Sequence, residues 1–241
     1  MRAFTAAAAI CVLGTLVFAV TPVASGQEVP TCEGTPATIA ATSSGPVFGT
    51  DGPDVIVGTT GADTIYGLGG DDQICGAPDG STSDGADSID GGNGDDFLVG
   101  MLGNDTLIGG NGDDGLVGGD FTGEPGNPAS KAPDGNDTLV GGSGNDFATG
   151  MLGTDTITGG NGNDELFGGP GNDAVSGDNG DDLVVGNFGN DTLSGGNGDD
   201  VLDGDNVDQT TQGPALDPNA NTDNCAGGHG ANQFFFCETQ S

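Results

Sequence analysis

Fifteen aspartates recur at nearly regular intervals along this chain of 241 residues. They are Asp54, Asp63, Asp72, Asp87, Asp96, Asp105, Asp114, Asp137, Asp146, Asp155, Asp164, Asp173, Asp182, Asp191 and Asp200. Most neighbours in the series are nine residues apart, and each aspartate follows a glycine by two positions. A short carboxylate in a glycine-rich turn, beside exposed backbone carbonyls, offers the oxygen ligands that Ca²⁺ prefers. The abundance of aspartate in such turns therefore favours binding of calcium.

The charge of the chain supports the same interpretation. It has 37 acidic and only 2 basic residues, which gives a formal net charge of −35. Internal ion pairs cannot balance so many carboxylates, so the sequence predicts a multivalent cation as a partner. Nucleic acid and anionic membrane surfaces are excluded, because both need Lys or Arg to neutralise phosphate.

The aspartates belong to repeated units of nine residues, and these units predict the fold. A branched aliphatic residue follows each aspartate by two positions, with Ala148 as the one exception. The three residues that follow each turn would form a brief strand. Two units would then form an 18-residue coil whose two strands lie in opposite sheets. Coils stacked about 4.8 Å apart would bury the aliphatic residues between the sheets. We therefore expect an all-β solenoid.

Two units, residues 91–99 and 195–203, read Gly-Gly-Asn-Gly-Asp-Asp followed by an apolar strand. They resemble the calcium-binding nonapeptides of the repeats-in-toxin (RTX) family, and the resemblance covers residues 49–204. It implies a parallel β-roll, or β-helix solenoid, in which the carboxylates of the fifteen aspartates and the backbone carbonyls of neighbouring coils are the ligands that share each Ca²⁺. The turns then allow at most about thirteen ions, and we expect the chain to be mostly unfolded without them. An alternative is that Gly-Asn-Asp turns merely suit tight β-turns.

Numbering the units from Gly49 separates them into two kinds. Odd units, with Asp54 first, stay close to the consensus; even units, with Asp63 first, carry the insertions 77–84 and 119–134. Even turns also contain Met101, Leu102, Met151, Leu152 and Phe188. We expect calcium to be held best along the odd turns. The even-turn edge is a candidate for partner contact, unless the loops fold over its apolar side chains.

The outward strand positions differ in the same way. Odd strands present the apolar residues Val55, Val57, Phe97, Val99, Val117, Phe147, Phe167, Leu183, Val185 and Val201. Self-association or docking would use this face, unless the N-terminal segment or a loop covers it. Even strands present Thr64, Thr106, Thr138, Thr156 and Thr192, with Ser88 and Ala174. Such a threonine ladder resembles the faces of ice-binding solenoids, although threonine is also a common residue of exposed strands.

The segments outside the repeats predict a secreted protein. Residues 1–26 have a basic start, an apolar stretch and small residues typical of a cleaved signal peptide; an uncleaved anchor is the alternative. We expect residues 27–48 to form an N-terminal cap, 205–224 a flexible loop and 225–241 a C-terminal cap. The sequence after residue 26 has no second apolar segment, so we expect no membrane insertion of the mature chain.

Four cysteines remain after the predicted cleavage, an even number that suits an oxidising compartment. Of the three possible pairings we favour Cys32 with Cys75 and Cys225 with Cys237, because each pair would secure one end of the array. Zinc is the alternative, although the spacing matches no zinc pattern.

Catalytic motifs are few. The only histidine is His229 in the predicted cap, and the sequence has neither a Gly-x-Ser-x-Gly motif nor a phosphate-binding loop. We therefore expect no enzyme activity. Adjacent carboxylates such as Asp95 and Asp96 leave a hydrolase as the remaining alternative.

Overall fold

The structure is a computed structural model that describes residues 29–42, 45–120, 135–204, 223–235, 237 and 239–240. The predicted signal peptide, most of the second insertion and most of the predicted 205–224 loop lie outside the described residues. The described residues form 22 β-strands and contain no helix that could cross a membrane. The prediction of an all-β fold is confirmed.

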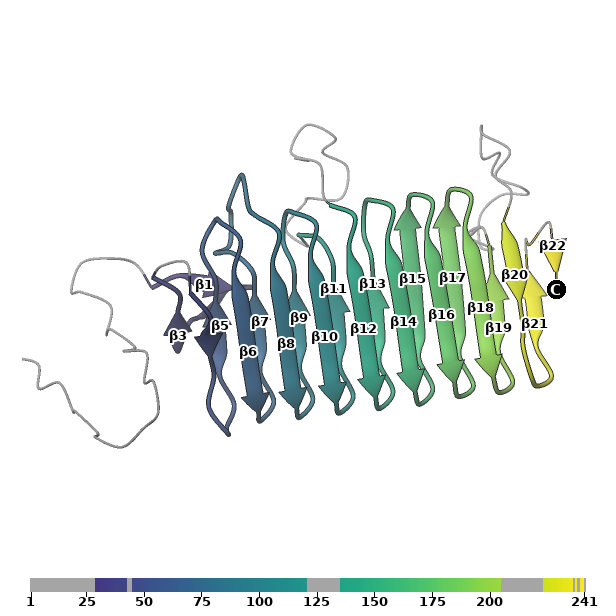
Figure 1. Cartoon of the computed structure of the whole chain (residues 1–241), viewed down its shortest axis with the longest axis horizontal. Helices are drawn as coiled ribbons and strands as arrows, with labels where there is room; N and C mark the ends of the chain where they lie inside the picture. Colours follow the sequence, from purple (N-terminus) through teal and green to yellow (C-terminus); the bar gives the residue numbers. More distant parts are fainter. Residues whose placement is uncertain are drawn as a thin grey trace, which may run out of the picture.

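Two parallel sheets of 10 strands each make up the body of the protein. The odd sheet contains β3 (Ile39–Ala40), β5 (Val55–Val57), β7 (Gln73–Cys75), β9 (Phe97–Val99), β11 (Gly115–Val117), β13 (Phe147–Thr149), β15 (Glu165–Pro170), β17 (Leu183–Phe188), β19 (Val201–Asp203) and β21 (Gln233–Phe235). The even sheet contains β4 (Val47–Phe48), β6 (Thr64–Gly69), β8 (Ser88–Asn93), β10 (Thr106–Asn111), β12 (Thr138–Ser143), β14 (Thr156–Asn161), β16 (Ala174–Asn179), β18 (Thr192–Asn197), β20 (Asn224–Ala226) and β22 (Thr239–Gln240). Successive strands alternate between the sheets, so the chain winds as a parallel β-roll whose coils stack along its long axis (Figure 1).

The register places the aliphatic residues of successive coils on top of one another. Ile56 pairs with Ile74 in the odd sheet, and Leu107 pairs with Leu139 in the even sheet. All of these residues are fully buried in one continuous core, which runs from Ile39 through the stack to Cys225. Because a single three-residue strand buries almost nothing alone, each coil depends on its neighbours for this core.

Many strands are longer than the three residues that the repeat predicts. Strands β6, β8, β10, β12, β14, β16 and β18 each have six residues, as do β15 and β17. In β8 and β10 the pairing continues through the glycines of the odd turn, with Gly92 opposite Gly110 and Asn93 opposite Asn111. Identical turns can stay in register beyond the strand proper, so the consensus turns are themselves part of the sheet.

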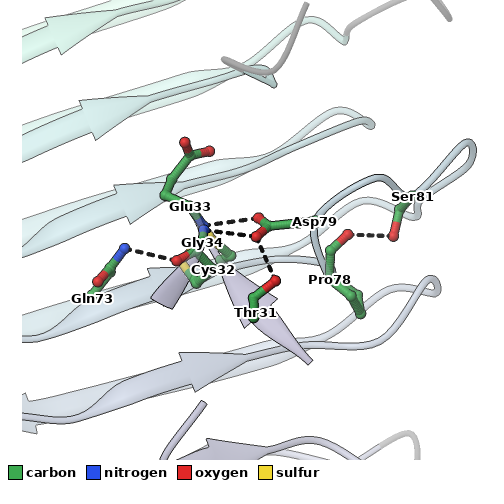
Figure 2. Close-up of a disulfide and its surroundings, with 9 residues drawn as sticks. Thr31, Cys32, Glu33, Gly34, Gln73, Pro78, Asp79 and Ser81 are labelled. Carbon is green, nitrogen blue, oxygen red and sulfur yellow. Dashed lines mark hydrogen bonds between the residues drawn. A yellow bond between two sulfur atoms is a disulfide. The ribbon is translucent and has the colours of Figure 1, made fainter. Parts of the chain in front are cut away.

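A small antiparallel hairpin, β1 (Thr31–Cys32) with β2 (Thr35–Pro36), lies on the outer face of the odd sheet. The disulfide Cys32–Cys75 attaches it there, with Cα atoms 5.5 Å apart. The carboxylate of Asp79 also holds it, because it accepts hydrogen bonds from Thr31 Oγ1 (2.6 Å) and from the backbone N–H groups of Glu33 and Gly34 (both 2.8 Å; Figure 2). Asp79 thus ties the first insertion to the N-terminal cap.

The hairpin covers part of the apolar outer face that the sequence predicts. Val57, Cys75, Val99 and Val117 are fully buried there in one cluster with Cys32. Cover by the N-terminal segment, the alternative to docking, is therefore confirmed for this half of the face. Further along the odd sheet Phe147 remains 39% exposed, and its ring lies 5.6 Å from that of Phe167.

The repeat pattern resumes at the C-terminal end of the stack. Strand β20 pairs with β18 so that Cys225 occupies the aliphatic position opposite Leu193, and β21 places Phe234 opposite Leu202. The second disulfide, Cys225–Cys237, has its Cα atoms 5.9 Å apart. Both pairings that the sequence favoured are thus present.

Candidate metal sites along the turns

The repeat aspartates form two rows, one along each edge of the roll. The odd row begins at Asp54 and the even row at Asp63. In both rows the backbone N–H of each aspartate donates to Oδ1 of the next one in the stack; the bond from Asp96 to Asp114 is 2.9 Å and that from Asp87 to Asp105 is 2.8 Å. This ladder fixes the orientation of every carboxylate after the first in each row. All of the predicted ligands except Asp54 are at most 4% exposed.

The second oxygen of these carboxylates is buried without a hydrogen bond. Within the described residues this is true of Oδ2 in Asp72, Asp87, Asp96, Asp105, Asp114, Asp146, Asp164, Asp173, Asp182 and Asp200. Burying an ionised oxygen without a partner costs several kcal/mol, on the order of the desolvation penalty of a charged group. A periodic series of such atoms indicates that something outside the polypeptide compensates them.

The oxygen donors of neighbouring coils meet over the glycine that opens each unit. A Cβ placed on Gly168 would lie 2.6 Å from Asp173 Oδ2 and 2.8 Å from the carbonyl oxygen of Gly186 in the next coil. The same convergence recurs at Gly91, which faces Asp96 Oδ2 and the carbonyl oxygen of Gly109. A side chain on this glycine would clash with both oxygens, so the close approach of carboxylate and carbonyl requires glycine.

This donor set fits Ca²⁺. Hard cations take carboxylate and backbone carbonyl oxygens, and Ca²⁺ tolerates irregular geometry. Among the described residues no three Asp, Glu, His or Cys side chains converge as a metal cluster, so each ion would depend on backbone carbonyls beside the aspartates. A Ca²⁺ bound between coils would neutralise the buried carboxylates and supply the partner that their Oδ2 atoms lack.

The carboxylates show the electrostatic effect of burial without an ion. Desolvation, and then the like charges of neighbouring aspartates, raise the pKa of Asp96 and Asp114 to about 6. The same causes raise the pKa of Asp87 and Asp105 to about 8 and that of Asp173 to about 7. Among these five carboxylates the pKa is raised further in Asp87, Asp105 and Asp173 of the even row than in Asp96 and Asp114 of the odd row.

The adjacent carboxylates that suggested a hydrolase do not converge. Asp96 is 3% exposed in the row, whereas Asp95 lies exposed on the turn, where its Oδ1 accepts the N–H of Asp113 at 3.0 Å. Asp71, Asp95 and Asp113 form a second, exposed ladder parallel to the odd row. In each adjacent pair, one carboxylate therefore belongs to the buried row and the other to the exposed ladder.

The apolar side chains of the even turns are divided between core and surface. Met101 is only 3% exposed in the cluster under the hairpin, and Met151 packs against that cluster. Phe188 instead is 61% exposed. The first insertion contributes Ala77 to this cluster, so the even edge is partly covered, as the alternative to partner contact predicted, and partly exposed.

Asp223 is a row member that sequence reasoning missed, because it was assigned to the flexible loop. It is fully buried, and its Oδ1 accepts the N–H of Asp191 at 2.8 Å. No glycine precedes it by two positions, so the pattern used for the other units did not find it. The later half of the unit, Asp223-Asn224-Cys225-Ala226-Gly227-Gly228, does match the repeat and could have revealed it.

Comparison with known sequences agrees with this geometry. The profile of the RTX calcium-binding nonapeptide repeat, which spans four copies, matches residues 48–80, 90–122, 134–166, 149–184 and 176–208, together more than half of the chain. A search of curated proteins found no match.

Proposed function

Because the chain belongs to the family of RTX calcium-binding nonapeptide repeat proteins, we propose that Ca²⁺ bound along both rows is the ligand that folds it. The observation that carries this proposal is the periodic series of buried, unpartnered Oδ2 atoms. Without a cation, stacking the coils brings like charges together in a desolvated environment, which opposes folding. With Ca²⁺, the same stacking creates the sites, so binding and folding are one reaction.

We further propose that this folded roll is a secreted, non-catalytic protein with a structural or adhesive role. The disulfides at both ends suit an oxidising compartment. The exposed remainder of the odd sheet around Phe147 and Phe167 is the candidate surface for docking or self-association. Sedimentation of the calcium-loaded wild type and of the calcium-loaded Phe147→Ser variant would test self-association through this surface.

The folding proposal is tested by far-UV circular dichroism of the chain without residues 1–26, titrated with Ca²⁺ after chelation. We expect a cooperative rise of β signal with Ca²⁺ and little with equal Mg²⁺, because Mg²⁺ demands octahedral geometry and dehydrates reluctantly. A full β signal already present in chelator would overturn the proposal.

The threonine ladder supports a second candidate, binding to ice or another regular surface. Thr106, Thr138 and Thr156 lie on adjacent strands in register, so they form a continuous ladder on the even sheet. Thermal hysteresis that Thr106→Tyr and Thr156→Tyr abolish would support this function. Its absence in the calcium-loaded protein would exclude ice binding.

A further inference from the structure

We propose that the aspartate rows begin and end in turns that are closed by protein groups in place of Ca²⁺. These turns are Thr50–Asp54 and Thr59–Asp63 at the N-terminal end, and the turn of Asn232 at the C-terminal end of the odd row. The inference rests on the proposed function, since it states which turns of the array do not take an ion. Asp54 and Asp63, both predicted ligands, then act as hydrogen-bond acceptors.

In the first turn of each row a threonine donates to Oδ2 of the carboxylate, whereas Oδ1 of Asp63 stays buried without a hydrogen bond. Oδ2 of Asp54 accepts the backbone N–H of Thr50 at 2.7 Å and its hydroxyl at 2.8 Å. Oδ2 of Asp63 accepts the same two groups of Thr59 at 2.6 and 2.8 Å. Later carboxylates such as Asp96 have no such partner for Oδ2, because glycine stands at the equivalent position, Gly92. The threonine hydroxyl thus takes the role of the cation.

The position of the carboxylate changes accordingly. A Cβ built on Gly168 has Asp173 Oδ2 as its nearest atom, at 2.6 Å. On Gly58 the corresponding oxygen, Asp63 Oδ2, is 3.0 Å away, behind two backbone atoms of Gly76, and on Gly49 no atom of Asp54 is among the three nearest. The threonine has drawn the carboxylate away from the place where Ca²⁺ would meet it in the other turns.

The coil before Asp54 offers no carboxylate to share an ion with it. Ala37 occupies the aspartate position there, and its N–H donates to Pro30 O at 2.9 Å instead of joining the ladder. The Thr38 hydroxyl lies within hydrogen-bond distance of two acceptors, Asp54 Oδ1 at 3.3 Å and Val55 O at 3.2 Å. Both oxygens of Asp54 therefore have protein donors, and its charge needs no buried cation.

The last turn of the odd row is closed by an amide. Asn232 Oδ1 accepts the N–H of Asp200 at 2.9 Å, as an aspartate would. Its Nδ2 donates to the carbonyl of Gly227 and lies next to the Gly227 Cα, where other units place Oδ2. An N–H donor thus stands in place of the carboxylate oxygen that would bind the ion, and it brings no negative charge. The row consequently ends without an unpaired oxygen in this turn.

Matched Asp→Asn variants test the proposal, because asparagine keeps the Oδ1 acceptor and removes the charged ligand. We would count bound Ca²⁺ per chain by equilibrium dialysis with elemental analysis, for the wild type, Asp54→Asn, Asp63→Asn and the mid-row control Asp114→Asn. We expect Asp54→Asn and Asp63→Asn to bind as many ions as the wild type, and Asp114→Asn to lose at least one. Loss in Asp54→Asn equal to that in Asp114→Asn would overturn the proposal.

A gain-of-site variant keeps the test decisive should an N-terminal variant fail to fold. Asn232→Asp restores a carboxylate beside the Gly227 carbonyl, so we expect one additional ion per chain; an unchanged count would contradict the proposal. A wild-type chain that binds no Ca²⁺ would refute the proposed function itself. That result differs from one in which calcium binds but the end turns take ions like the others.

Discussion

The backbone N–H of Asp114 donates to Oδ1 of Asp146 at 2.8 Å, across 32 residues of sequence that include the second insertion. Each carboxylate after the first in its row is therefore held by the coil before it and presents its second oxygen to the turn. The ladder and the proposed ion use different oxygens of one side chain, which makes their contributions separable by mutation.

Asp146→Asn and Asp146→Ala should differ in their free energy of unfolding. Both remove a calcium ligand, but only Ala also leaves the buried N–H of Asp114 without an acceptor, which costs about 1–3 kcal/mol. Urea unfolding in saturating Ca²⁺ should therefore rank the free energy of unfolding as wild type above Asn above Ala. Equal values for Asn and Ala would show that the ladder contributes nothing.

The calcium-free roll should become less stable as pH rises. Desolvation raises the pKa of Asp105 to about 8 and that of Asp114 to about 6, from the usual value of 3.8. Between pH 3.8 and about 8 the folded chain thus binds more protons than the unfolded chain, so stability is fully present below this window and is lost as pH rises through it. Circular dichroism without calcium should show more β signal near pH 4 than near pH 8.

Calcium should reverse this dependence. The ion binds the ionised carboxylates, so binding at pH 6 must release protons and apparent affinity should rise with pH. Calcium titrations at pH 6 and pH 8 would measure this shift. An affinity that falls with pH would contradict the assignment of the row carboxylates as ligands.

The sequence predicts the roll well because one period sets its turns, its core and its register together. Residues such as Ile56 and Leu107 could be placed in the core from their phase alone. Asp223 could not be found in this way, since its unit lacks the first glycines and follows a long irregular segment. Its place in the row depends on pairing with Asp191 in the stack, which is a tertiary contact.

The hairpin over the odd sheet illustrates a second limit. Periodicity identifies Val57 and Val99 as outward-facing and apolar, but it does not say what covers them. The cover is a non-repetitive segment, held by a disulfide and by Asp79 from the insertion. The role of Thr50 could not be predicted either. A threonine in place of the repeat glycine indicates only a poorer match to the repeat pattern and does not indicate a closed turn.

Asp79→Ala should release this hairpin. The substitution removes the acceptor of three hydrogen bonds, from Thr31, Glu33 and Gly34, while the Cys32–Cys75 disulfide remains. We expect increased binding of a hydrophobic dye such as ANS, because Val57 and Val99 become accessible, and a loss of stability of about 1–3 kcal/mol. Asp51→Ala, at an exposed position, is the control and should change neither. Unchanged dye binding in Asp79→Ala would mean that the disulfide alone holds the hairpin.

Gly168→Ala should weaken calcium binding without removing any ligand. The added Cβ would lie 2.6 Å from Asp173 Oδ2 and 2.8 Å from Gly186 O, so it occupies the space where carboxylate and carbonyl meet. Gly52→Ala is the matched control, because its Cβ would find no neighbour nearer than Thr50 Oγ1 at 4.0 Å. We expect the calcium midpoint of folding to rise several-fold for Gly168→Ala, and Gly52→Ala to remain within about 0.5 kcal/mol of the wild type, as surface substitutions usually do. If both variants titrate like the wild type, the close approach of carboxylate and carbonyl over Gly168 plays no part in calcium binding.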